Sequence, residues 1–179
     1  MMTPILITGS GVVSAVGTGK AETLEALLNC RSGVGPLKYL KTEHKEFPVG
    51  EVKMTDAEMR ERLGIPQDAI TTRTALMGMI ALGEALEDAH LTSDILPKVG
   101  FISGTTVGGM DMSEQFFLDF VEGEGHREYI AVHDCGNCSE MTAAHYGKFA
   151  FRPSAIQFLR LGRGLNGNGI PQQRWSSLS

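Results

Sequence analysis

The sequence contains no Asp, Glu or Lys after Phe151. Residues 1–151 hold all 21 acidic residues and 12 of the 16 basic ones, so their formal charge is 12 − 21 = −9. Residues 152–179 are charged only through arginines, and their formal charge is 16 − 12 = +4. We expect a folded domain over 1–151. For 152–179 we expect a divergent tail that is disordered or translated in a shifted frame, with a genuine but unusual extension as the alternative.

Several other absences exclude whole classes of protein. No apolar run approaches the ~18–20 residues that a membrane-spanning helix requires, so no membrane span is expected. The N-terminus has no basic segment, which argues against a signal peptide. A net charge of −5 without a concentrated basic face argues against a nucleic-acid partner. Three cysteines, an odd number, do not indicate a disulfide framework. Together these features predict a reduced, cytoplasmic protein.

The residues that are present alternate between strand-like and helix-like patterns. Short apolar segments predict strands at 4–8, 49–53 and 98–103, and another that starts at Lys148. Periodic apolar residues predict helices, which we expect over 18–29, 56–63, 71–91, 111–122 and 139–146. The alternation indicates an α/β fold with a largely parallel sheet.

The helix expected over Thr71–Leu91 is the most apolar of these elements. Its apolar and small residues cover more than half of its circumference, so it should be buried on most sides.

Gly9-Ser10-Gly11 follows the first expected strand, as the phosphate-binding glycines of a dinucleotide site would. The fingerprint requires a third glycine at the position of Ser14, and its helix should begin at once rather than near Thr18. A tight turn with close packing therefore explains the glycines better, and we expect no nicotinamide or other cofactor.

Cys135 and Cys138 have the spacing of a redox dithiol or of half a zinc site, and His133 and His145 lie nearby in the sequence. No second cysteine pair exists to complete a zinc site. Two structural thiols at the start of a helix are the simpler interpretation, and the redox or metal-binding module stays open as an alternative. Cys30, near another helix end, is expected to be buried.

Four segments, taken in order, resemble the β-ketoacyl-acyl-carrier-protein synthases. The resemblance covers about residues 4–151, the front part of the N-terminal half of such an enzyme. It is carried by Ile5-Leu6-Ile7-Thr8-Gly9-Ser10-Gly11-Val12-Val13-Ser14 with Gly17, by Arg31-Ser32-Gly33, by Arg73-Thr74-Ala75 with Ala81 to Ala89, and by Val99-Gly100-Phe101-Ile102-Ser103-Gly104-Thr105 to Gly109.

The resemblance implies an incomplete thiolase-like fold, namely part of the N-terminal half of a layered αβαβα architecture. Family members are usually homodimers. They load an acyl group onto a cysteine at the tip of a buried helix and join it to a carbanion formed by decarboxylating malonyl on acyl carrier protein. Two histidines from the C-terminal half assist. Val107 matches the position where the family lines its acyl pocket and dimer contact.

The chain departs from the family where the nucleophile should stand, shortly after the strand expected at Lys148. No cysteine follows Cys138, and Cys135 and Cys138 both precede that strand. The C-terminal half with its histidines has no counterpart in the 179 residues. We expect no catalytic residue, no metal site and no condensation by this chain alone.

Three further hypotheses stay open: a half-enzyme that pairs with a separately encoded second half, the thiol or metal module, and a non-catalytic binder of acyl carrier protein. If a covering half is missing, the helix over 71–91 should be partly exposed, which predicts aggregation.

Overall fold

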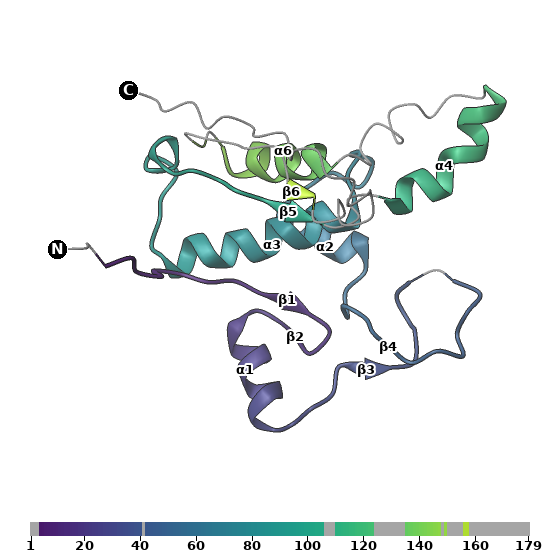
Figure 1. The fold of residues 1–179 in the computed structure, drawn as a ribbon, viewed down its shortest axis with the longest axis horizontal. Coiled ribbons are helices and arrows are strands. Elements are labelled where there is room, and N and C mark those ends of the chain that lie inside the picture. The colour runs from purple at the N-terminus through teal and green to yellow at the C-terminus, as the bar shows by residue number, and fades with distance from the viewer. Residues whose placement is uncertain are drawn as a thin grey trace, which may run out of the picture.

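The computed structural model describes residues 4–40, 42–105, 110–123, 135–147, 149 and 156–157. The helices in these ranges are α1 (Lys20–Leu28), α2 (Asp56–Leu63), α3 (Arg73–Asp88), η1 (Leu96–Lys98), α4 (Met110–Glu122) and α6 (Cys135–Tyr146). The strands are β1 (Val13–Ser14), β2 (Gly17–Thr18), β3 (Val34–Gly35), β4 (Val49–Gly50), β5 (Gly104–Thr105) and β6 (Ile156–Gln157). Figure 1 shows α2, α3 and α6 close together, with α1 and the β3–β4 pair to one side.

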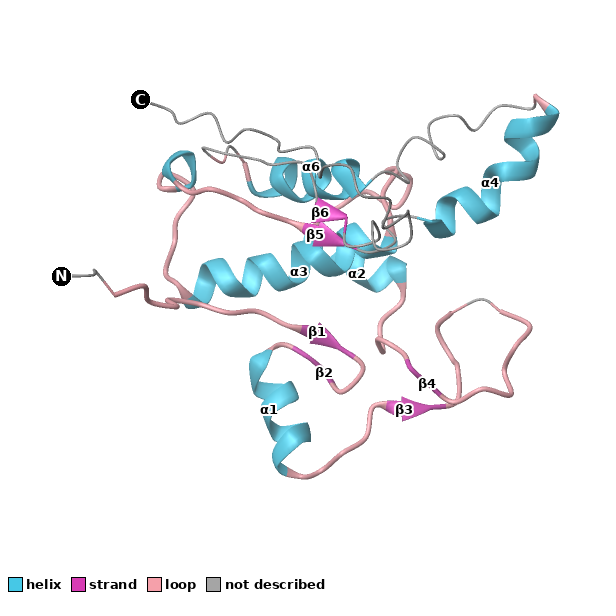
Figure 2. Ribbon diagram, viewed as in Figure 1, coloured by secondary structure: helices cyan, strands magenta, loops and turns pink. Residues whose placement is uncertain are grey.

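The described strands form three two-stranded sheets, drawn in magenta in Figure 2. β1 pairs with β2, and β3 with β4, both antiparallel. β5 pairs with β6 in parallel, so two residues of the expected tail, Ile156 and Gln157, form a strand. Within the described residues, the predicted parallel sheet is represented by this β5–β6 pair alone.

Two strand predictions were wrong within the described residues, whereas the strand expected over 49–53 begins where β4 does. The segment 4–8 is assigned no strand, and Ile5 and Ile7 are 98% and 92% exposed. Of 98–103, Lys98 ends η1, Gly100 forms an isolated β-bridge, and the strand begins only at Gly104. The strand expected to start at Lys148 lies outside the described residues except for Phe149, so it stays a prediction. An apolar run supplies the propensity for a strand, but a strand also needs a neighbour to accept its hydrogen bonds.

α2 has the bounds that the sequence predicts. Thr55 begins it with a capping box, in which its side chain accepts from the Glu58 N–H and the Glu58 carboxylate accepts from the Thr55 N–H. Gly64 ends it in the left-handed region at φ 66°. The local residues therefore suffice to fix both ends of this helix.

α3 is the centre of the described core. Thr72 begins it by accepting from the Ala75 N–H, and its first half is buried between α2 and α6. Leu76 and Met59 of α2 are 0% exposed and belong to one cluster. The second half of α3 is only partly buried, and the helix ends at Asp88 rather than at 91. Burial on most sides is thus confirmed for the first half alone.

α1 and α4 present large apolar side chains to solvent. α1 begins after Gly19, whose φ is 107°, rather than at Thr18, and Ala26 is its one fully buried residue. The exposed apolar residues of α1 and α4 are Leu24, Leu27, Leu28, Met110, Phe117, Leu118, Phe120 and Val121.

No described helix is both long and apolar enough to cross a bilayer.

Candidate functional site

The glycine pair near the N-terminus packs directly against α3. A Cβ added to Gly11 would lie 2.0 Å from the Ala81 carbonyl oxygen, and one added to Gly9 would lie 2.4 Å from the Ala85 carbonyl oxygen. No side chain fits at either distance. The backbone of this segment therefore touches the backbone of α3, as the close-packing interpretation predicts.

The amide groups of the same segment are occupied by carboxylates of α3. Ser10 donates its N–H to Asp88 Oδ2 at 2.9 Å. Val12 donates to Glu84 Oε2 at 2.9 Å, and Lys20 donates to Glu84 Oε1 at 2.6 Å. A bound pyrophosphate would use backbone N–H groups of this kind. Here the protein's own carboxylates hold them, so the contact explains the glycines without a ligand.

Asp88 also forms a salt bridge with Lys20, which joins the start of α1 to the end of α3. The hydrogen bond from the Lys20 ammonium, followed by that from the Ser10 N–H, lowers the pKa of Asp88 below its ordinary value against the opposing effect of desolvation. Both interactions favour the ionised carboxylate, so the charge of Asp88 strengthens this junction.

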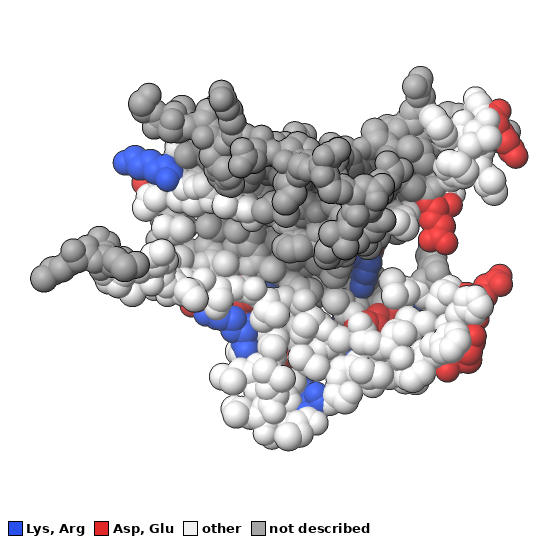
Figure 3. Space-filling view, viewed as in Figure 1, with Lys and Arg blue, Asp and Glu red and all other residues white. Residues whose placement is uncertain are grey.

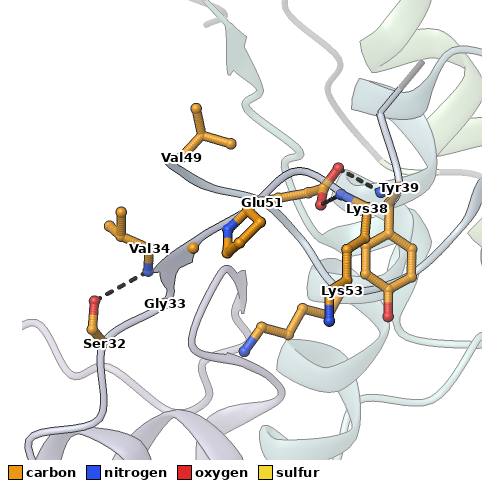
Figure 4. A pocket seen from close by; sticks show the side chains of 10 residues that line it. Ser32, Gly33, Val34, Lys38, Tyr39, Val49, Glu51 and Lys53 are labelled. Atoms are coloured by element: carbon orange, nitrogen blue, oxygen red, sulfur yellow. Dashed lines mark hydrogen bonds between the residues drawn. The ribbon is translucent and has the colours of Figure 1, made fainter. Parts of the chain in front are cut away.

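A second carboxylate, Glu51, clamps the loop between β3 and β4. It follows β4 directly, is 7% exposed, and accepts from three consecutive backbone N–H groups: those of Lys38 and Tyr39, each at 2.8 Å, and that of Leu40 (Figure 4). Desolvation raises the pKa of Glu51, but the three N–H donors and the charge of Arg73 together outweigh it, so the pKa lies below its ordinary 4.5.

Arg73, at the start of α3, fixes the segment that follows Glu51. Its guanidinium donates to the carbonyl oxygens of Val52 at 3.1 Å and Met54 at 2.9 Å, and it forms a salt bridge with Asp56. Arg73 belongs to a segment that carries the family resemblance. In this structure its visible role is to position the chain between β4 and α2.

A pocket of about 290 Å³ lies beside the Glu51 clamp. Lys38 and Lys53 line it together with Val34, Pro36 and Val49. Sequence reasoning missed both the clamp and this pocket, because nothing in the spacing of these residues marks them.

A second pocket, of about 420 Å³, lies between the start of α1, α3 and the end of α6. Tyr146 lines it and donates its hydroxyl to the Met79 carbonyl oxygen at 2.6 Å. A Cβ on Gly83 would lie 2.3 Å from that hydroxyl. Burial raises the pKa of Tyr146, and the nearby Glu87 carboxylate raises it further. The tyrosine is thus a neutral packing group between α6 and α3.

Most of the residues that the sequence singles out for a function are described only in part or not at all. Val107 and His133 lie outside the described residues. Cys135 and Cys138 lie in the first turn of α6, at a helix start as predicted, although only their backbone is described. The described ranges contain no group of three His, Cys, Asp or Glu side chains that could hold a metal ion.

The prediction for Cys30 was wrong, because this cysteine is exposed. It follows α1 with a φ of 50°. Leu27 and Leu28, in the last turn of α1, are also exposed, so the C-terminal end of this helix faces solvent.

On the face drawn in Figure 3, the basic side chains lie apart from one another, while acidic ones gather over the β3–β4 loop and the far end of α4.

No family model matches the chain. It is 29% identical over 111 residues to 3-oxoacyl-[acyl-carrier-protein] synthase 1 of Buchnera aphidicola subsp. Baizongia pistaciae, a match that covers 60% of this chain and 27% of that protein. It is 28% identical over 122 residues to the synthase of the same name from Escherichia coli K12, covering 66% and 29%. The chain thus spans less than a third of the curated relatives it matches.

Among solved structures, the chain is similar to the ishigamide ketosynthase/chain length factor. The TM-score is 0.65 at 22% identity, over 84% of this chain and 39% of that one. The resemblance to β-ketoacyl synthases is therefore confirmed, and so is the fold class: the chain has part of the thiolase-like α/β fold.

Proposed function

We propose that these residues are a portion of a β-ketoacyl-acyl-carrier-protein synthase and do not condense acyl groups by themselves. The similarity to two named 3-oxoacyl-[acyl-carrier-protein] synthases, in a chain whose fold is that of a ketosynthase, supports the first statement. The whole enzyme would join acyl and malonyl thioesters carried on acyl carrier protein, in fatty-acid or polyketide synthesis in the cytoplasm.

The second statement rests on the cysteines. A condensing enzyme must hold its acyl group as a thioester, which requires a thiolate beside the substrate channel. Cys138 is the last cysteine of the chain, and it lies in α6, before the segment 148–151 that the family resemblance places ahead of the nucleophile. Val107 would line the acyl pocket, again by resemblance alone.

A condensation assay tests this proposal. The purified chain is incubated with acyl- and malonyl-acyl carrier protein, and the β-ketoacyl product is quantified against an intact 3-oxoacyl synthase. The matched control is the same chain with all three cysteines replaced by serine. We expect the two chains to give equal, background amounts of product. Turnover that the cysteine-free chain lacks would refute inactivity.

The same assay addresses the half-enzyme hypothesis. The apolar side chains exposed on α1 and α4 resemble the surface of a domain whose cover is supplied by another polypeptide or by a dimer partner, as in intact family homodimers. Adding a separately produced C-terminal half would restore turnover only if a nucleophile were supplied with it.

Titration with acyl carrier protein alone tests the hypothesis of a non-catalytic binder.

One observation favours a second candidate, the thiol-redox or metal-binding module. Cys135 and Cys138 occupy the N-terminal turn of α6, where the helix dipole stabilises a thiolate. A thiol titration across pH, together with zinc analysis of the purified chain, distinguishes this module from an inactive portion of a synthase. A reactive pair or one bound zinc per chain would favour the module.

A further inference from the structure

Two lysines without a carboxylate partner line one side of the pocket beside the Glu51 clamp. Lys38 and Lys53 form no salt bridge with any described residue. In Figure 4 both side chains extend away from the Glu51 carboxylate. From this pairing of charge and cavity we infer that the β3–β4 pocket binds a small phosphate monoester with an apolar body.

The walls of the pocket are fixed before any ligand arrives. β3 and β4 are paired in the register Val34 with Gly50 and Gly35 with Val49. Glu51 ties the end of β4 to the backbone of the segment 38–40 through its three accepted hydrogen bonds. Arg73 then holds the chain beyond Glu51 against α3. A site built on such fixed walls loses little conformational entropy on binding.

The charges favour a phosphate monoester over a carboxylate. Such a phosphate carries about −1.5 to −2 at pH 7, and two ammonium groups balance that charge. Lysine binds phosphate as a point charge and needs no bidentate geometry. Glu51 also lines the pocket, but its carboxylate is directed at three backbone N–H groups, which offset part of its repulsion of an anion. The Ser32 hydroxyl accepts from the Val34 N–H at 3.1 Å and keeps its own proton for donation.

Apolar side chains in the same pocket favour a ligand that also has an apolar group. Val34, Pro36 and Val49 line the pocket together with the lysines, and Val34 is 60% exposed. A volume of about 290 Å³ accommodates a single ring or a short alkyl chain beside the phosphate. Covering these side chains releases the water that now contacts them, which inorganic phosphate alone does not do.

Phenyl phosphate is the probe that combines both features. Its binding to the full chain is measured by isothermal titration calorimetry, beside inorganic phosphate and benzoate. We expect phenyl phosphate to bind at least several-fold more tightly than inorganic phosphate or benzoate. Its binding should weaken as salt is added, because salt screens the two lysine charges. Equal affinity for the three anions, or no heat from phenyl phosphate at millimolar concentrations, would overturn the inference.

Substitutions assign the binding to this pocket. Lys38→Met and Lys53→Met should each lower the affinity for phenyl phosphate about three- to ten-fold, since each removes one charge-assisted contact. Lys45→Met is the matched control, because Lys45 lies in the same loop, is exposed and does not line the pocket. Each variant is checked for an unchanged far-ultraviolet circular dichroism spectrum. An equal loss in all three variants would place the anion elsewhere and contradict the inference.

Discussion

Gly11→Ala is the substitution that most directly probes the packing of the N-terminal segment on α3. The added Cβ would lie 2.0 Å from the Ala81 carbonyl oxygen and 2.9 Å from the Ala85 nitrogen. Ordinary van der Waals contact begins at 3.4 Å, so the two backbones must separate by about 1 Å or more. That shift also stretches the 2.9 Å hydrogen bond from the Val12 N–H to Glu84. Overpacking costs about 1–3 kcal/mol, and we expect about 2–4 kcal/mol once the weakened charged hydrogen bond is included.

Urea unfolding of the full chain, followed by circular dichroism, measures this loss. Gly35→Ala is the matched control, because a Cβ at Gly35 meets no atom within 4 Å. We expect the urea midpoint to fall for Gly11→Ala and to stay within error for Gly35→Ala. Equal midpoints for the two variants would refute the claim that glycine at 11 is required for packing.

Three further predictions test the other contacts. The pKa of Glu51 in the folded chain lies below 4.5, so its ionised carboxylate stabilises the fold above that pH. This contribution disappears as the pH falls through the folded-state pKa. Glu51→Gln should therefore lose less stability on acidification than the parent chain, as measured by urea midpoints at neutral and acid pH. Thr55→Ala removes the capping box of α2 and should cost about 1 kcal/mol by thermal unfolding, and an unchanged melting temperature would contradict the capping role. Leu76→Ala should lower the free energy of unfolding by about 2–5 kcal/mol. Leu28→Ala, the control at a residue that is 75% exposed, should lower it by less than about 0.5 kcal/mol. Similar losses at the two sites would show that the core does not lie at Leu76.

The helices could be predicted because their signals are local. Thr55, Glu58 and Gly64 give both ends of α2, and the apolar pattern gives α3 to within three residues at its C-terminal end. Among the strands, the expected segment 49–53 begins where β4 (Val49–Gly50) does, but other strand predictions failed. The segment 4–8 has the composition of a buried strand, yet a strand exists only where a neighbour pairs with it, and no described residue does so.

The contacts around the candidate site were out of reach for a related reason. Glu84 bonds the Val12 N–H across 72 positions in the sequence, and Asp88 bonds the Ser10 N–H across 78. No local pattern marks such pairs. The glycines at 9 and 11 did indicate a close approach of the backbone, and α3 is what they approach. The boundary between residues 1–151 and 152–179 stays a prediction.

Intact-mass spectrometry after incubation with acyl-acyl carrier protein tests the central claim most directly, because the first half-reaction of a condensing enzyme leaves a thioester on its own sulfur. We predict no adduct above the level found on the chemically unfolded chain, whose thiols, including that of exposed Cys30, report nonspecific transfer. A stoichiometric acyl adduct formed only by the folded chain, and abolished by replacing Cys30, Cys135 or Cys138 with serine, would contradict the account.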